Sequence, residues 1–115
     1  MKVHGVFQNP TSTQNVAAGT TIFSEGQSGE EMYGIVEGEV ELRTNDKTIA
    51  RLGPDDVFGE MALVDDSPRM ATAIATSDTV LSLVDRRHFL FLVHETPMFA
   101  LQVMSAMADR LRTGT

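Results

Sequence analysis

The chain of 115 residues contains no cysteine and no run of eighteen apolar residues. Without cysteine it can form neither disulfides nor thiolate metal sites. Without a long apolar run it offers no candidate membrane-spanning helix. Its first ten residues, MKVHGVFQNP, also lack the hydrophobic stretch of a signal peptide. The lack of both kinds of apolar segment predicts a cytoplasmic protein with no membrane span, while the lack of cysteine does not identify a compartment.

Basic residues are scarce. Nine lysines and arginines stand against sixteen acidic residues, which gives a formal net charge of −7 and a pI near 4.7. This balance disfavours direct contact with nucleic acid or with an anionic membrane surface. The three histidines, His4, His88 and His94, lie in separate contexts, and no His-x-His pair is present. A metal site of the cupin kind therefore has little support, and we predict no metal and no catalytic residue.

Residues 14–85 have the pattern of a mainly β protein. Glycine, proline, asparagine and aspartate recur at roughly ten-residue intervals between short apolar stretches. In residues 39–44, Val40 and Leu42 alternate with charged residues, which indicates a strand with one buried face. The expected strands cover about residues 14–17, 20–23, 32–36, 39–44, 48–52, 70–76 and 79–84. We predict an antiparallel β-roll or jelly roll of about eight short strands.

The last thirty residues change to a helical period. A first helix is expected over residues 86–94, with four inward-facing side chains: Phe89, Leu90, Leu92 and Val93. Glu95-Thr96-Pro97 breaks it, because threonine can cap a helix and proline fits the first helical position. A second helix should follow from Met98 to about Arg112.

The polar residues of the second helix form one narrow stripe: Gln102, Ser105, Asp109 and Arg112. The rest of its surface is mostly apolar, which is a wider apolar arc than packing against the β-roll alone requires. Either it lies in a crevice between the β-roll and the preceding helix, or Phe99, Val103 and Ala106 pack on a second surface. Arg110 is interpreted as a solvated or helix-terminal charge. The predicted organisation is one domain, with a short N-terminal segment (1–13), a β-roll (14–85) and C-terminal hinge and lid helices (86–115).

The stretch 58–73, FGEMALVDDSPRMATA, concentrates features of an anion site. Gly59 precedes a single helical turn, whose free amides and positive dipole end attract anions. After the turn at 65–68, Arg69 returns near the start of this helix. Its planar fork of donors suits a phosphate. The alternative is that Arg69 forms a surface ion pair with Asp65 or Asp66.

Glu60 complicates a simple phosphate site, because its negative charge would repel the ligand. An ionised carboxylate can only accept hydrogen bonds, so a sugar hydroxyl is its natural partner. The alternative is that Glu60 only stabilises the N-terminus of the short helix through its dipole. The stretch therefore indicates a ligand that carries a phosphate and a sugar hydroxyl close together.

Residues 58–73 resemble the phosphate-binding cassette of cyclic-nucleotide-binding domains. That family includes catabolite activator protein, regulatory subunits of cAMP-dependent protein kinase and nucleotide-gated channels. The upstream pattern agrees, with Gly19-x-x-Ile22-Phe23-x-x-Gly26 and then Met32-Tyr33-x-Ile35-x-x-Gly38-x-Val40-x-Leu42. The resemblance covers roughly residues 15–90 and implies a β-roll sensor whose C-terminal helix closes over the nucleotide base, carries the signal and often dimerises.

The resemblance also implies roles for single residues. Gly59, Glu60 and Ala62 would meet the ribose phosphate, Glu60 would take the ribose 2′-hydroxyl, and Arg69 would take the cyclic phosphate. The predicted binding residues are Phe58, Gly59, Glu60, Met61, Ala62, Arg69, Met70 and Ala71. A threonine at position 70 would favour cGMP, so Met70 removes one argument for cGMP, and cAMP is the preferred expectation.

The sequence thus predicts a non-catalytic cyclic nucleotide sensor whose C-terminal helices move on binding. Its partners would be the cyclic nucleotide and either a second copy joined through the C-terminal helix or an effector protein. Two alternatives are a degenerate domain that serves as a protein-interaction module and a cupin-like jelly-roll enzyme. A transcription factor would need a helix-turn-helix beyond residue 115, so the chain is either a stand-alone binding protein or the sensor of a longer polypeptide.

Overall fold

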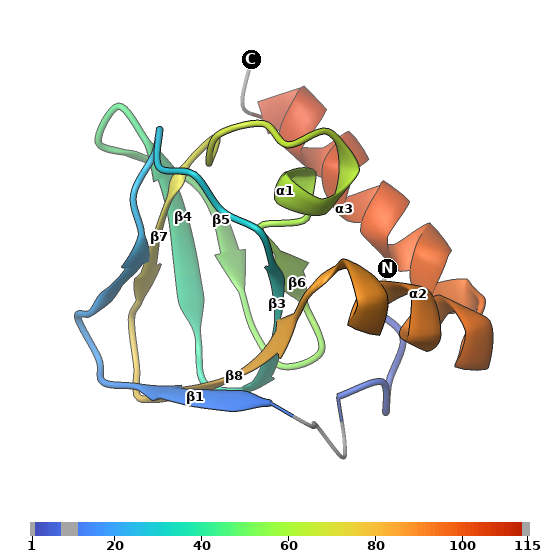
Figure 1. The fold of residues 1–115 in the computed structure, drawn as a ribbon. Helices are drawn as coiled ribbons and strands as arrows, with labels where there is room; N and C mark the ends of the chain where they lie inside the picture. Colours follow the sequence, from blue (N-terminus) through green and yellow to red (C-terminus); the bar gives the residue numbers. More distant parts are fainter. Residues whose placement is uncertain (1, 8–11, 114–115) are drawn as a thin grey trace.

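The computed structural model describes residues 2–7 and 12–113. Eight strands and three helices follow one another in this part of the chain (Figure 1). In order they are β1 (Thr13–Val16), β2 (Thr21–Phe23), β3 (Met32–Glu37), β4 (Val40–Thr44), β5 (Lys47–Leu52), β6 (Val57–Phe58), α1 (Met61–Val64), β7 (Thr72–Ala75), β8 (Thr79–Val84), α2 (Arg86–Glu95) and α3 (Met98–Thr113).

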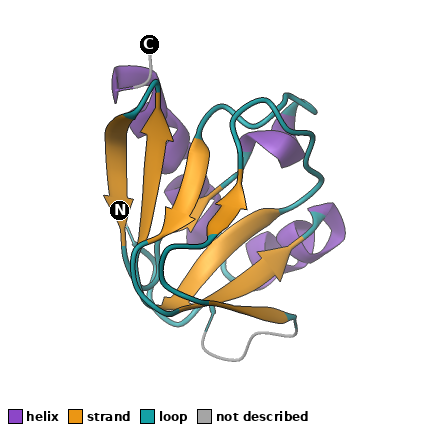
Figure 2. Cartoon of the chain, turned by 90° about the vertical axis from the view of Figure 1, so that its left-hand side faces the viewer, coloured by secondary structure: helices purple, strands orange, loops and turns teal. Residues whose placement is uncertain are grey.

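The strands form two four-stranded antiparallel sheets, with orders β1-β8-β3-β6 and β2-β7-β4-β5. Figure 2 views the molecule from the strand side, with the helices behind the sheets. The main core draws Tyr33, Ile35 and Leu81 from the first sheet and Leu42 and Ala73 from the second. The predicted mainly β roll with C-terminal helices is therefore confirmed.

Alternating side chains account for the position of β4. Val40 and Leu42 are buried, while Arg43 is exposed, as the period-two pattern predicts. β8 instead has apolar residues facing both ways. Leu81 belongs to the main core, and Val84 belongs to a second core beneath the helices. This strand therefore joins the two cores.

Some predicted boundaries are wrong. β6 has only two residues and was not predicted, since a strand this short gives no periodic signal. β7 begins at Thr72 rather than at residue 70, because Met70 and Ala71 still belong to the bend that carries the cassette. Within the predicted short N-terminal segment, residues 4–7 form a turn.

The second core lies between the roll and the two C-terminal helices. It contains Phe99 and Val103 of α3, which are 0% and 3% exposed, together with Val57 and Val84 of the sheet. Three side chains of α2 and Ala106 of α3 contact this core. The helix therefore occupies the expected crevice between the roll and α2. The alternative that Phe99, Val103 and Ala106 pack on a second surface is wrong, because this face is already covered.

Two further expectations about the helices are wrong. Leu90 of α2 was predicted to face inward but is 61% exposed. Gln102 was placed in a polar stripe of α3 but is 2% exposed. Its amide donates to the carbonyl of Asp55 at 2.6 Å and accepts from the amide of Val3 at 3.0 Å. These bonds connect α3 to the β5–β6 loop and to the N-terminal segment.

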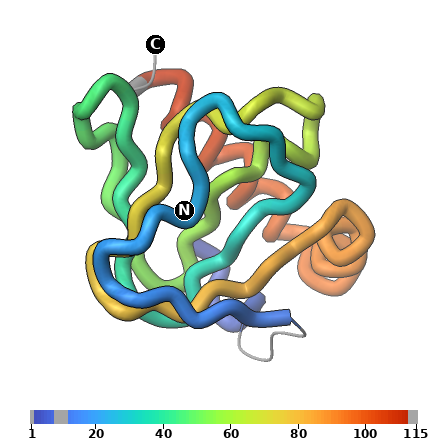
Figure 3. The backbone as a smooth tube through the Cα atoms, turned by 60° about the vertical axis from the view of Figure 1, so that its left-hand side comes forward, coloured from blue at the N-terminus to red at the C-terminus, as the bar shows by residue number. Residues whose placement is uncertain are grey.

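The segment after β6 and the C-terminal half of α3 lie on the same side of the roll (Figure 1, Figure 3). Asp85 fixes the start of α2, because its side chain accepts a hydrogen bond from the amide of His88 at 2.8 Å. Residues 96–97 then turn the chain so that α3 runs back toward the cassette. No helix in residues 2–7 and 12–113 has the length and apolar character needed to cross a membrane.

Candidate ligand-binding site

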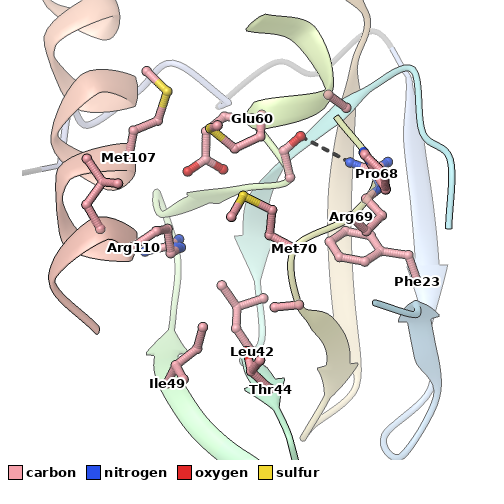
Figure 4. A pocket seen from close by; sticks show the side chains of 15 residues that line it. Phe23, Leu42, Thr44, Ile49, Glu60, Pro68, Arg69, Met70, Met107 and Arg110 are labelled. Carbon is pink, nitrogen blue, oxygen red and sulfur yellow. Dashed lines mark hydrogen bonds between the residues drawn. The ribbon is translucent and has the colours of Figure 1, made fainter. Parts of the chain in front are cut away.

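A cavity of about 210 Å³ lies between the cassette, the β4–β5 hairpin and α3 (Figure 4). Most of the predicted binding residues line it. These are Gly59, Glu60, Met61, Ala62, Arg69, Met70 and Ala71, and the cassette also contributes Pro68, which was not predicted. The remaining walls come from Phe23, Leu42, Thr44, Ile49, Met107, Arg110 and Leu111. The cavity is thus mostly apolar, with three charged side chains, Glu60, Arg69 and Arg110, and one hydroxyl, that of Thr44.

Phe58 is the one predicted binding residue that does not line the cavity. It is 0% exposed, and its ring stacks on Tyr33 with centroids 5.1 Å apart and an interplanar angle of 15°. Phe58 therefore belongs to the core beneath the site.

Gly59 allows the chain to turn from β6 into the cassette. Its φ of +77° lies in the left-handed region, which glycine adopts without steric cost. A Cβ at this position would also come within 2.8 Å of Nη1 of Arg69. The backbone carbonyl of Gly59 accepts a hydrogen bond from that same Nη1 at 3.1 Å. The glycine thus serves both the turn and the placement of the arginine.

Arg69 is buried, with 7% exposure. Its backbone is held by two bonds, since its amide donates to the carbonyl of Gln27 and its carbonyl accepts from the amide of Gly26, both at 2.8 Å. Its guanidinium carbon lies 4.3 Å from the centroid of the Phe23 ring. This arrangement holds the side chain inside the fold at the edge of the cavity.

The alternative that Arg69 pairs with neighbouring aspartates is wrong. Both aspartates are exposed. Asp66 pairs with Arg86 at 3.6 Å, and Asp65 accepts a hydrogen bond from the amide of Ser67 at 3.1 Å. Their charges are therefore directed away from the cavity.

Glu60 occupies the N-cap position of α1, but its carboxylate makes no capping hydrogen bond. The residue is 2% exposed. Burial raises the pKa of Glu60 above its usual 4.5, while Arg110, its own backbone amide and Arg69 act in the opposite direction. Desolvation is the largest of these effects, so the carboxylate is held at an electrostatic cost.

Arg110 was not predicted as part of the site. It is partly buried, its Nη2 donates to the carbonyl of Val57 at 3.3 Å, and it lines the cavity. The interpretation as a solvated charge is therefore wrong. A helix that is apolar on nearly every side does not reveal which residues will face a neighbouring cavity. Met107 and Leu111 were missed for the same reason.

Phe23 belongs to the main core as well as to the cavity wall. Leu42, Thr44 and Ile49 come from a hairpin far from the cassette in sequence, and their strand pattern carries no sign of a ligand. Only tertiary structure brings them to the site.

Three cavity-lining residues have buried polar atoms without a hydrogen-bond partner in the described part of the chain. These atoms are Oε1 of Glu60, Nε of Arg69 and Oγ1 of Thr44. Buried polar groups are nearly always hydrogen-bonded, so such atoms mark a place that a ligand can complete. A carboxylate and a guanidinium together fit a ligand with a hydroxyl and an anionic oxygen. Residues 2–7 and 12–113 contain no cluster of three or more potential metal ligands.

The fold and the cavity thus define a β-roll that can bind a compact anion bearing a hydroxyl. Residues 13–96 match the family described as the cyclic nucleotide-binding domain. The chain belongs to this family, and the resemblance noted in its sequence is confirmed.

Relatives of several kinds share the domain. The chain is 38% identical over 99 residues to the cyclic AMP receptor protein of Thermus thermophilus, covering 82% of this chain and 46% of that protein. It is 40% identical over 89 residues to the cGMP-dependent protein kinase of Plasmodium berghei, covering 76% of this chain and 10% of the kinase. The chain spans less than half the length of these curated relatives.

A solved structure agrees with the fold. The crystal structure of Thermus thermophilus catabolite activator protein matches with a TM-score of 0.74 and 35% identity, covering 88% of this chain and 50% of that one. Domains of this family bind cyclic nucleotides in regulatory proteins and are generally non-catalytic.

Proposed function

We propose that this domain is a sensor that binds cAMP in preference to cGMP and performs no catalysis itself. The observation that carries the proposal is the pair of buried, unpartnered polar atoms on Glu60 and Arg69, which line one cavity. A cyclic nucleotide supplies a hydroxyl for the first and an anionic phosphate oxygen for the second. Among the described residues, Glu60 and Arg69 are the only charged side chains with a buried polar atom that lacks a hydrogen-bond partner.

The phosphate would lie between Arg69 and the first amides of α1. The amide of Met61 precedes the first backbone hydrogen bonds of that helix, so it is available to an anion. Ala62 leaves room for the ligand beside it. The carboxylate of Glu60 would accept a hydrogen bond from the ribose 2′-hydroxyl, which turns a repulsive charge into a specific contact.

The base would occupy the apolar part of the cavity, whose wall includes Leu42, Ile49, Met70, Met107 and Leu111. Guanine carries both a carbonyl and an amino group that need hydrogen-bond partners, whereas adenine has fewer such groups. Polar groups buried without partners are costly, and these walls offer a base only the hydroxyl of Thr44 and the guanidinium of Arg110, so the mostly apolar lining favours adenine. One relative is named for cyclic AMP and another for cGMP, so the relatives do not decide between the two ligands. The preference for cAMP rests on this wall.

Helix α3 would carry the signal. Its residues Met107, Arg110 and Leu111 form one wall of the cavity, so a bound base contacts the helix directly. A ligand shifts a conformational equilibrium only by its different affinity for the two states. Contacts between the base and α3 provide that difference, and α2 and α3 would move relative to the roll.

The recipient of the signal is proposed to be a second copy of the chain, with an effector protein as the alternative. Leu101, Met104 and Leu111 of α3 are 47%, 56% and 68% exposed, and they recur at helical spacing. Apolar residues in such a row fit the same row on another helix. The cytoplasmic location stays a prediction from the sequence.

A thermal-shift screen with cAMP, cGMP and the linear monophosphates tests the proposal. A ligand at about a hundred times its dissociation constant should add about 2.7 kcal/mol to the free energy of unfolding. We expect stabilisation by cAMP, less by cGMP, and little by linear AMP. Equal melting temperatures with and without every cyclic nucleotide would overturn the proposed function and favour a degenerate interaction module.

A further inference from the structure

Arg69 lies in a slot made of two aromatic rings and two glycines. Its guanidinium carbon is 4.3 Å from the ring centroid of Phe23 and 5.6 Å from that of Tyr33. A Cβ added at Gly29 would collide with the guanidinium, and one at Gly59 would come within 2.8 Å of Nη1. The slot therefore has the dimensions of the guanidinium and leaves it little freedom to move.

The slot contains no negative charge. Within residues 2–7 and 12–113, Arg69 forms no ion pair with a carboxylate. Its side chain donates to the carbonyl of Gly59, and its charge interacts with the phenol of Tyr33. Glu60 influences Arg69 only through a weaker electrostatic interaction across the cavity. A buried cation usually requires a counter-charge, and here the ring of Phe23 takes that place.

An aromatic ring attracts a cation through the negative potential over its face, but it has no charge of its own. The guanidinium is therefore held in place while its full positive charge remains available. A carboxylate in the same position would hold the side chain equally firmly, but it would neutralise the charge and compete with an incoming phosphate.

We propose that Phe23 and Tyr33 are positioning residues for the phosphate, which hold Arg69 against their rings so that the phosphodiester becomes its counter-ion. The inference rests on the proposed function, because it concerns how that same site recognises its anion. Phe23 is the main contributor, since its ring is the nearer one and lines the cavity. Tyr33 lies farther away and contributes through its hydroxyl as well as its ring.

The rings themselves are rigidly placed. Phe23 and Tyr33 are 5.9 Å apart, and both contact the fully buried ring of Phe58 at 5.9 and 5.1 Å. Phe58 belongs to the same cluster, yet its ring has no cation–π contact with Arg69 in the described structure. Phe58 is therefore a matched control, because changes there alter the aromatic cluster but not the face that meets the guanidinium.

The test replaces Phe23 by phenylalanines that carry one, two or three ring fluorines. Fluorine withdraws electrons from the ring face while the shape of the side chain is nearly kept. The affinity for cAMP, measured by calorimetry, should fall with each added fluorine, by about tenfold in total. The same series at Phe58 should leave the affinity unchanged. A merely structural role of Phe23 would give equal affinities at every fluorination level.

Two further variants and one further ligand complete the experiment. Phe23→Leu should bind cAMP more weakly than the parent does, but it should bind the neutral methyl ester of the cAMP phosphate equally well. Tyr33→Phe should lower the affinity for cAMP by about threefold. A parent protein that binds no cyclic nucleotide would overturn the proposed function and this inference together. A parent that binds cAMP, with a flat fluorine series at Phe23, would overturn only the positioning role and leave the proposed function intact.

Discussion

Glu60 and Arg110 are fifty positions apart in the sequence, yet both line the same cavity, and the positive charge of Arg110 opposes the rise in the pKa of Glu60. Figure 4 shows the two side chains on neighbouring walls, one from the cassette and one from α3. Burial outweighs the attraction, so the carboxylate remains electrostatically unfavourable in the folded chain. The site thus keeps a buried charge that does not stabilise the fold.

Replacing Glu60 by glutamine should therefore change stability and binding in opposite directions. Glu60→Gln is expected to raise the free energy of unfolding of the ligand-free protein at neutral pH, because a buried charge is removed. It should lower the affinity for cAMP by about 1–3 kcal/mol, the value of a hydrogen bond to a charged group. Urea denaturation and calorimetry measure the two effects. Glu37→Gln, at an exposed position, should change neither.

The pH dependence follows from the direction of the pKa shift. Because the pKa of Glu60 is raised in the folded chain, the folded state holds this proton more tightly than the unfolded state. The resulting stabilisation is full below the usual value of 4.5 and is lost as the pH rises through the folded pKa. The stability difference between Glu60→Gln and the parent should therefore be small at about pH 4 and grow toward neutral pH. A difference that is constant with pH would contradict this account.

Gly29 offers a test of the placement of Arg69. Gly29→Ala should displace the guanidinium, which is the flexible end of a side chain, and should cost little stability. The affinity for cAMP should fall by at least about tenfold, since misplacing one partner of a charged contact costs about 2 kcal/mol or more. Gly53→Ala is the matched control, because a Cβ there meets nothing within 4 Å. Equal affinities of the two variants would show that the slot does not matter.

The exposed row on α3 predicts a dimer. Light scattering at micromolar concentration should show association of the parent, and Leu101→Glu or Met104→Glu should abolish it by placing charges opposite one another. Leu90→Glu, a change at an exposed residue of α2, should leave association intact. A parent that remains a strict monomer with and without cAMP would remove the proposed dimer.

The roll was predictable from the sequence because its signals are local. Turn residues set the strand boundaries, and most of the predicted binding residues lie within one stretch that folds back on itself around Gly59 and Arg69. The cavity wall that α3 forms could not be predicted in the same way. Helix α3 is apolar on most of its surface, so its periodicity does not distinguish the buried Phe99 from the exposed Leu101.

Polar residues on α3 were misleading for a related reason. Gln102 is buried because two backbone groups, on Asp55 and Val3, satisfy its amide. Arg110 turns toward the cavity, where it meets the carbonyl of Val57 and the charge of Glu60. These partners are far away in sequence, so no local pattern identifies them.

Isothermal titration calorimetry with cAMP, on the parent and on Arg69→Ala, tests the central claim most directly. The parent should bind one cAMP per chain, and Arg69→Ala should lose about 2–5 kcal/mol of binding free energy, since the phosphate loses the partner of its charge. Arg51→Ala, a change at a cation whose side chain is 78% exposed, should bind like the parent. Equal affinities of the parent and Arg69→Ala would show that the nucleotide does not bind at this cassette.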